Sequence, residues 1–145
     1  MSENVLNFME ICYRGAIRLK ELIDNLLDSS LLDSKKFELK LNKEDLVKII
    51  TEVVNEMTHL AKIRELILET DMPDSLFLDV DKLRLRQAIN NIISNAIKNT
   101  PTGGTIFVNL SENDCFIDIR VKDTGVGITK KEMEKLFEKF GKIER

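Results

Sequence analysis

The amino-acid sequence predicts an α+β fold, a two-layer sandwich of a mixed sheet covered by helices, preceded by one long helix. Three observations predict it. Residues 3–33 are amphipathic over the length of a long helix, and residues 81–100 repeat their apolar positions at the helical period. Short segments between and after them alternate apolar and polar side chains, as half-buried strands do. The expected order is helix, then strand–helix–strand–strand–helix–strand–strand–helix.

The opening helix, residues 3–33, carries an apolar stripe with polar residues on its flanks. The stripe comprises Leu6, Met9, Tyr13, Ile17, Leu19, Leu22, Ile23, Leu26 and Leu27. Such a stripe packs either on the helix's own domain or in a bundle with another subunit. We expect the chain to divide into a helical segment, residues 1–35, and a larger domain, residues 36–145.

The next elements are expected from short periodic segments bounded by turn and cap signals. Residues 36–41 alternate and predict a strand, and Asn42 is a good N-cap for a helix to about Ala61. The residues of that helix expected to face inward are Leu46, Ile49, Ile50, Val53 and Met57. Residues 65–71 and 76–80 predict strands on either side of a turn.

The central helix, residues 81–100, is expected to begin at Asp81 as its N-cap. One face comprises Leu85, Ile89, Ile92, Ile93 and Ala96, and the opposite face Arg84, Gln87, Asn91, Asn95 and Lys98. The asparagines present neutral carbonyl oxygens, which suit a Mg²⁺ ion already neutralising a triphosphate, and Lys98 could meet a phosphate. The alternative is that these amides only decorate an exposed helix.

The last part of the chain delivers a carboxylate at the end of a strand. Ile106, Val108 and Leu110 alternate as one strand, and a hairpin at residues 112–114 leads to the next. That strand places Cys115, Ile117, Ile119 and Val121 on one side and ends at Asp123, followed by Thr-Gly-Val-Gly-Ile. Such a carboxylate can accept a hydrogen bond from the adenine amino group, and glycines let the backbone approach a base. A simple turn is the alternative. Thr129 and Glu132 predict a capping box for a final helix through Phe137.

The composition restricts the class of protein. The chain has 145 residues, 43% of them hydrophobic and 32% charged, which fits one soluble domain with an appended helix. A net charge of −3 gives no basic field for nucleic acid, and no apolar run is as long as a membrane span. The two cysteines have no metal-type spacing and are expected to be reduced thiols. His59, the single histidine, has no catalytic neighbour in sequence and is expected to have a structural or surface role.

Three segments, NIISNAIKNTP, DTGVGI and LFEKFGKIER, resemble the N box, first glycine box and F box of sensor histidine kinases. These kinases belong to the GHKL ATP-binding superfamily, with its Bergerat fold. The resemblance covers roughly the whole chain. The opening helix is similar to the second helix of the dimerisation and phosphotransfer hairpin of these kinases. By that resemblance its stripe packs in a four-helix bundle between two subunits.

The resemblance implies ATP and Mg²⁺ as ligands and assigns roles to residues. Asn95 would be the Mg²⁺ ligand, Asn91 an assisting polar contact and Lys98 a phosphate contact. Asp123 would read adenine. The base pocket and the mobile lid over the nucleotide would be formed by Gly125, Gly127, Ile128, Phe137 and Phe140. Hydrolytic relatives carry a glutamate general base at the position of Asn91, so phosphoryl transfer is favoured over hydrolysis.

The chain departs from the kinase pattern in three places. Asn99 stands where an aromatic residue usually packs near the base, which predicts weaker nucleotide binding. The second glycine box, which would give backbone N–H groups to the phosphates, is absent. The helix that would carry the phosphoacceptor histidine is also absent. We therefore expect a kinase piece truncated at both ends, with no autophosphorylation on its own.

Three functional hypotheses follow. The first is the ATP-binding part of a sensor histidine kinase that transfers the γ-phosphate of Mg·ATP to a histidine. The family then implies a response regulator receiver domain as partner, a homodimer through the opening helix and a cytoplasmic location, with a membrane anchor in the parent left open. The second is a non-catalytic module that binds nucleotide or dimerises and modulates an intact kinase. The third is an anti-sigma-type serine kinase, which the opening helix disfavours.

Overall fold

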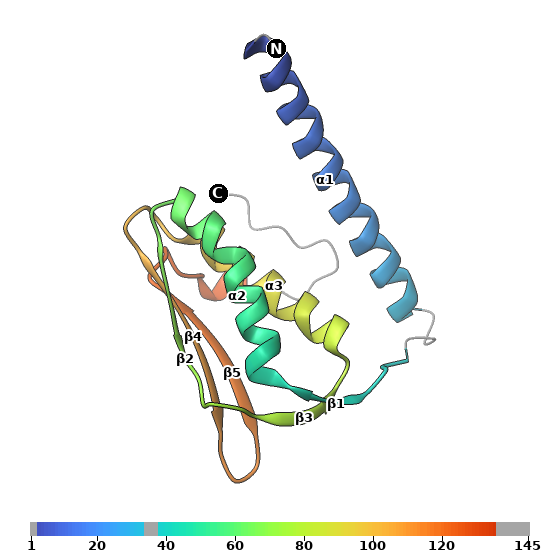
Figure 1. Ribbon diagram of the computed structural model, residues 1–145, viewed down its shortest axis with the longest axis vertical. Helices are drawn as coiled ribbons and strands as arrows, with labels where there is room; N and C mark the ends of the chain where they lie inside the picture. The colour runs from blue at the N-terminus through green and yellow to red at the C-terminus, as the bar shows by residue number, and fades with distance from the viewer. Residues whose placement is uncertain (1–2, 34–37, 136–145) are drawn as a thin grey trace. The chain divides into compact units, whose positions relative to one another are not determined.

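The structure is a computed structural model that describes residues 3–33 and 38–135. The chain divides into two compact units, Met1–Leu39 and Lys40–Arg145. The first unit contains helix α1 (Glu3–Asp33), shown in blue in Figure 1. Its predicted apolar stripe is exposed: Leu22 is 52% and Leu26 is 54% accessible. No helix in the described part of the chain combines the length and the apolar character that crossing a membrane requires.

The second unit contains the sheet and its covering helices. Its elements are β1 (Asn42–Asp45), α2 (Leu46–Ile63), β2 (Ile67–Asp71), β3 (Phe77–Val80), α3 (Lys82–Asn99), β4 (Thr105–Glu112), β5 (Ile117–Asp123) and α4 (Lys130–Lys135). Strands β1 and β3 form an antiparallel ribbon, and the other strands form a sheet in the order β2-β4-β5. In that sheet β2 runs parallel to β4 and β4 antiparallel to β5. Figure 1 shows α2 and α3 on one face of it. The predicted α+β class and mixed sheet are confirmed.

The core lies between these helices and the inner face of the sheet. Strand β4 contributes every second residue, as its alternation predicts: Ile106, Val108 and Leu110 are at most 2% exposed. The helices contribute Leu46, Ile49, Ile50, Val53, Ile89, Ile93, Ala96 and Ile97. Burying one such large aliphatic side chain stabilises a fold by about 1.5–3 kcal/mol. This burial sets the distance and rotation of α3 over the sheet.

The predicted strand at residues 36–41 is wrong for the part that the structure describes. Pairing occurs one segment later, where Asn42 begins β1, and Asp45 rather than Asn42 is the N-cap of α2. The reason lies in the Asp45 carboxylate. Its Oδ1 accepts the Val47 N–H at 3.1 Å and the Leu76 N–H at 3.3 Å, so one side chain begins the helix and holds the chain entering β3.

Two predicted orientations were also wrong. Ile92 is 51% exposed, and Ile97, completely buried, takes its place in the core. The sheet lies beneath the row of Ile89, Ile93 and Ile97, which rotates Ile92 outward. Cys115 is exposed in the hairpin turn because β5 begins only at Ile117. The side chain of Asn113 shapes that turn by accepting the N–H groups of residues 115 and 116.

The predicted capping box at α4 is confirmed. The Thr129 N–H donates to Glu132 Oε2 at 2.8 Å, and the Glu132 N–H donates to Thr129 Oγ1 at 3.3 Å. Reciprocal bonds of this kind satisfy helix-start donors that would otherwise lack a partner. Phe137, where the helix was expected to end, lies outside the described residues.

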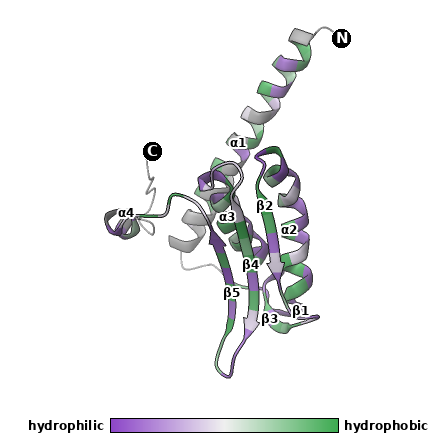
Figure 2. Cartoon of the chain, turned by 90° about the vertical axis from the view of Figure 1, so that its left-hand side faces the viewer, coloured by the Kyte–Doolittle hydropathy of each residue, from purple (hydrophilic) through white to green (hydrophobic). Residues whose placement is uncertain are grey.

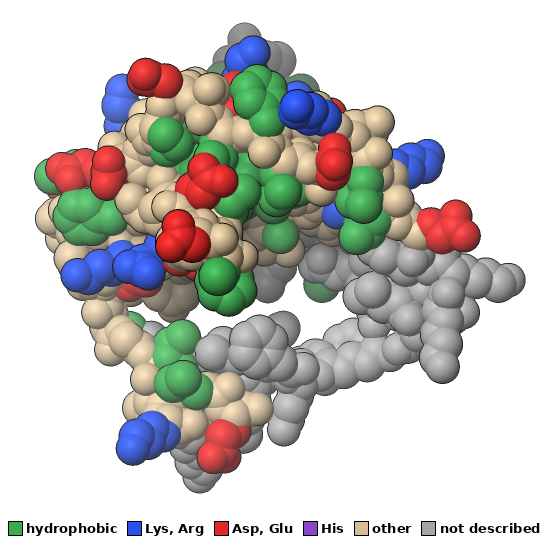
Figure 3. Space-filling model, turned by 90° about the horizontal axis from the view of Figure 1, so that it is seen from below, with side chains coloured by type: hydrophobic (Ala, Val, Ile, Leu, Met, Phe, Trp, Pro, Cys, Tyr) green, Lys and Arg blue, Asp and Glu red, His purple; other side chains and the backbone are tan. Residues whose placement is uncertain are grey.

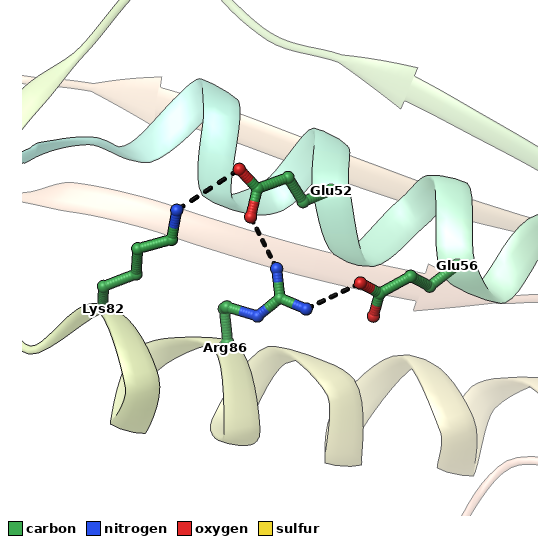
Figure 4. Close-up of polar contacts among 4 residues, drawn as sticks. All are labelled: Glu52, Glu56, Lys82 and Arg86. Carbon is green, nitrogen blue, oxygen red and sulfur yellow. Dashed lines mark hydrogen bonds and ion pairs between the residues drawn. The ribbon is translucent and has the colours of Figure 1, made fainter.

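An ion-pair cluster holds α2 against α3 (Figure 4). Arg86 of α3 donates to Glu52 at 2.6 Å and to Glu56 at 2.7 Å, while Lys82 reaches Glu52 at 3.3 Å. The hydrogen bond to Glu56, followed by that to Glu52, raises the pKa of Arg86. The bond from Lys82 is the largest cause of the lowered pKa of Glu52. Because these groups are partly exposed, the cluster sets the register of the helices more than it adds stability.

Asp81 links the beginning of the second unit to the central helix. It is the predicted N-cap of α3, and its Oδ1 accepts the Arg84 N–H at 3.1 Å. Its Oδ2 accepts the Lys40 N–H at 3.0 Å. These bonds stabilise the carboxylate, so the pKa of Asp81 is lowered, with the Lys40 bond the largest cause. The charged form of Asp81 therefore favours the folded state.

We expect Asp81→Asn to lower Tm by a few degrees at pH 7, because an amide accepts more weakly than a carboxylate. A group whose folded pKa is lowered stabilises the protein above its unfolded pKa. The difference from wild type should therefore shrink as the pH falls through and below the ordinary Asp value of 3.8. Thermal unfolding between pH 7 and pH 3 measures it, with Asp74→Asn in the exposed turn as control. A pH-independent difference would contradict this account.

Candidate functional site

The end of β5 and the C-terminal end of α3 meet through their backbones. A Cβ added to Gly125 would lie 2.6 Å from the Asn99 carbonyl oxygen and 2.6 Å from Asp123 Oδ1. Real Cβ atoms do not approach so closely, so only glycine fits at this position. The segment after β5 therefore passes directly beside the last turn of α3. In this way Asp123 becomes a neighbour of α3, the helix that bears the asparagines. In the sequence Asp123 follows Asn91 of that helix by 32 residues.

Asp123 is exposed at the end of β5, as predicted. Its Oδ1 accepts the Gly125 N–H at 2.8 Å. This bond orients the carboxylate. A carboxylate oriented in this way can accept a hydrogen bond from an exocyclic amino group of a base.

Three threonines brace this segment, and sequence reasoning did not assign them a role. The Thr124 N–H donates to the Thr105 carbonyl at 3.1 Å, and the Thr105 N–H donates to Thr124 Oγ1 at 3.0 Å. Thr100, only 1% exposed, donates its hydroxyl to the Ala96 carbonyl at 2.7 Å and ends α3. Gly104 lies between them, because its Cβ would contact both Thr100 and Thr124. The sequence did contain a signal for these roles. Thr100 stands in an Asn-Thr-Pro segment and Thr124 in an Asp-Thr-Gly segment, on either side of Gly104.

The predicted polar face of α3 is present. Asn91, Asn95 and Lys98 are all exposed, and the two asparagines lie one helical turn apart. The Asn99 side chain folds back along the helix, donating to the Asn95 backbone carbonyl at 2.8 Å. The Asn95 backbone oxygen is thus engaged, while its side-chain amide projects from the helix surface.

The remaining predicted site residues are in the segment that follows β5. Gly127 has φ +72°, a conformation that glycine adopts without strain, and Ile128 is 47% exposed. Phe137 and Phe140 lie outside the described residues. The structure thus brings Asp123 and Gly125 together with the end of α3.

The side chains available as metal ligands limit how the site can bind a metal ion. Among residues 3–33 and 38–135, no three His, Cys, Asp or Glu side chains gather as a metal site would require. His59 is exposed on α2. Neutral amides alone bind Mg²⁺ weakly, because this ion prefers anionic oxygens and keeps several waters. A cation at Asn91 and Asn95 would therefore need anionic oxygens from a bound phosphate.

Comparison with known proteins gives concordant results. Residues 80–145 match the family described as histidine kinase-, DNA gyrase B- and HSP90-like ATPase. The chain is 32% identical over 146 residues to the sensor histidine kinase WalK of Bacillus subtilis, covering 95% of this chain and 23% of WalK. It is 30% identical over 139 residues to the ArcB homolog, an aerobic respiration control sensor of Haemophilus influenzae, covering 94% of this chain and 42% of that protein. The chain thus spans less than half of these relatives.

Solved structures share the fold. Full-length ShkA in complex with AMPPNP superposes with a TM-score of 0.83 at 23% identity, over 98% of this chain and 31% of that one. The histidine kinase ThkA, in complex with the response regulator protein TrrA, gives 0.74 at 21% identity, over 94% of this chain and 40% of that one. The fold, the family match and the identity with sensor kinases along nearly the whole chain agree. Residues 80–145 therefore carry a domain of the histidine kinase-, DNA gyrase B- and HSP90-like ATPase family, and the chain is similar to sensor histidine kinases along nearly its whole length.

Proposed function

We propose that the chain is the nucleotide-binding part of a larger sensor histidine kinase. This parent kinase transfers the γ-phosphate of ATP to a histidine. The observation that carries the proposal is the packing of Gly125 against the Asn99 carbonyl. This contact holds Asp123, the carboxylate proposed to read the base, beside the last turn of α3, the helix that bears Asn91 and Asn95. One ligand with a base at one end and phosphates at the other fits this arrangement.

In the proposed site Asp123 accepts a hydrogen bond from the adenine amino group. Guanine carries an acceptor at that ring position, so the same carboxylate disfavours GTP. Asn95 supplies an oxygen to Mg²⁺, Asn91 assists and Lys98 contacts phosphate. The bound metal would neutralise phosphate charge, while this chain's residues orient the nucleotide.

Phosphoryl transfer is favoured over hydrolysis. Asn91 lies one turn before Asn95 on the exposed face of α3. An amide has no basic lone pair at neutral pH, so Asn91 cannot take a proton from an attacking water. A parent kinase built on this site transfers phosphate to an acceptor residue in place of water.

The proposed parent acts with partners. ThkA forms a complex with the response regulator protein TrrA, and we infer a receiver domain of that type as the partner of this chain's parent. Helix α1 would form the dimerisation segment, residues 1–35, beside an ATP-binding domain, residues 36–145. The division into units at Leu39 and Lys40 supports this organisation. Charges of both signs are interspersed with hydrophobic groups on the face in Figure 3, unlike a nucleic-acid surface.

Nucleotide titration by calorimetry tests the site. We expect ATP to bind in preference to GTP, and Asp123→Asn to weaken ATP binding about tenfold or more, since a charged acceptor is lost. Asn95→Ala should remove the Mg²⁺ dependence and leave metal-free binding unchanged. Asn55→Ala, on the exposed face of α2, is the matched control. Wild-type ATP binding in both site variants would refute the assignment.

Gly125→Ala tests the backbone contact. The added methyl group would collide with the Asn99 carbonyl and separate β5 from α3. We expect a loss of about 1–3 kcal/mol in the free energy of unfolding, together with weaker ATP binding. Gly15→Ala is the control, because no described atom beyond its chain neighbours and the nearby backbone of its own helix lies within 4 Å of its added Cβ. Urea unfolding measures the first effect, and unchanged stability would show that the contact is not a constraint.

A second candidate function, a non-catalytic dimerisation module, is favoured by the exposed stripe of α1. Under either function we expect self-association, weakened at least tenfold by Leu22→Glu with Leu26→Glu, because both charges enter the apolar stripe. Thr51→Glu with Asn55→Glu adds the same charge at the same spacing on α2. Sedimentation velocity compares the pairs. If the α1 double variant and the α2 double variant associate equally strongly, the α1 stripe is not the interface.

A further inference from the structure

Two carboxylates at the starts of α2 and α3 each make a second contact. Asp45 caps α2 and also accepts the Leu76 N–H at 3.3 Å, where the chain approaches β3. Asp81 caps α3 with Oδ1, and its Oδ2 accepts the Lys40 N–H at 3.0 Å, where the chain approaches β1. Each carboxylate therefore begins one helix and also holds the chain that leads into one strand of the β1–β3 ribbon.

The ribbon joins the beginning of the second unit to the beginning of α3. Asn42 of β1 pairs with Val80 of β3, and Asp81 follows directly as the helix cap. Figure 2 shows the ribbon at the foot of α2, and Figure 1 shows the chain rising from it into α3. Lys40 is the first residue of the second unit. Any pull on the chain before Lys40 therefore acts on its bond to Asp81.

The first two turns of α3 are held mainly by polar contacts. The buried residues of α3 begin at Ile89, and none of residues 82–88 is buried. Leu85 packs against the core but is only partly buried. The ion pairs of Arg86 with α2 and the bond between Asp81 and Lys40 hold this half of the helix. The start of α3 is therefore the part of the helix that can be displaced with the least loss of apolar packing.

The opposite end of α3 is fixed, because only glycine fits between the Asn99 carbonyl and the segment after β5. At about 1.5 Å per residue, Asp81 lies about 27 Å and Asn91 about 12 Å from Asn99 along the helix. With that end as the pivot, a displacement of the cap by about 1 Å moves Asn91 by about 0.4 Å. Groups of a functional site must be held to within about 0.5 Å. A small displacement of the cap thus reaches the proposed metal and phosphate contacts.

We propose that Asp81 is a positioning residue for the nucleotide site, because its bond to Lys40 holds α3 where Asn91 and Asn95 meet the phosphate end of ATP. This inference rests on the function proposed above and adds a means of regulating it. When a movement of the entering chain breaks the bond, α3 tilts and ATP affinity falls about fivefold, at the lower end of typical couplings between two sites. By reciprocity, bound ATP makes the same bond about fivefold harder to open.

Two variants remove the bond from its two sides. Asp81→Ser keeps an N-cap, because serine can accept the Arg84 N–H, but it has no second oxygen for Lys40. Lys40→Pro removes the donor N–H and leaves the Asp81 carboxylate in place. Glu38→Pro, two residues earlier and also exposed, is the matched control for the proline. Far-UV circular dichroism and thermal unfolding show that each variant is folded.

Calorimetry with Mg·ATP and hydrogen exchange of the Lys40 amide, followed by NMR, measure the same coupling in two ways. We expect both variants to bind ATP about fivefold more weakly than wild type, and Glu38→Pro to bind like wild type. Saturating ATP should slow exchange of the wild-type Lys40 amide by the same factor, because this amide exchanges when its bond opens. A purely structural role of Asp81 would lower stability without this response of Lys40 to ATP.

The outcomes separate this inference from the function on which it rests. Wild-type affinity in both variants, or exchange at Lys40 that ATP leaves unchanged, would overturn the positioning role and leave the nucleotide site in place. Weaker binding in only one variant would trace the effect to the helix cap or to the proline, and would overturn the positioning role as well. If the wild-type chain itself does not bind ATP, the proposed function is wrong and the positioning role with it.

Discussion

The close approach of the backbone at Gly125 to the carbonyl of Asn99 is the constraint on which the site depends. No side chain fits between them, so the end of β5 and the end of α3 have one relative position. Asp123 is held there by its bond to the Gly125 N–H. A carboxylate on a mobile loop would have to be ordered on binding, at a cost in conformational entropy that this short turn avoids.

The rest of the second unit keeps that contact in place. Ile93 and Ile97, both fully buried, fix the rotation of α3 over the sheet, and the Arg86 cluster fixes its position along α2. The reciprocal bonds of Thr105 and Thr124 hold β5 to β4 at the point where the chain turns toward the helix. Apolar packing supplies most of the stability here, while the polar bonds supply position.

Sequence reasoning succeeded where one local signal decides the structure. The alternation of Ile106, Val108 and Leu110, the cap at Asp81 and the capping box at Thr129 each depend on nearby residues, and the structure contains all three. It failed where a distant partner decides. Asn42 pairs with Val80 of β3 and so joins a strand instead of capping a helix. The exposure of Ile92 depends on how α3 lies over the sheet, which helical periodicity alone does not specify.

The candidate site shows the same division at a finer level. The residue types of Asn91, Asn95 and Asp123 were readable from the sequence because amides and carboxylates have distinct chemistry. The approach of Asp123 to the end of α3 was not, because it depends on Gly125 and Asn99, whose contact is made by backbone atoms. The neutral amides have a further consequence for the proposed site. Since the described residues gather no acidic cluster, Mg²⁺ affinity there must come from phosphate oxygens. Metal and nucleotide would therefore bind as one unit, and binding of either would strengthen binding of the other by the same factor.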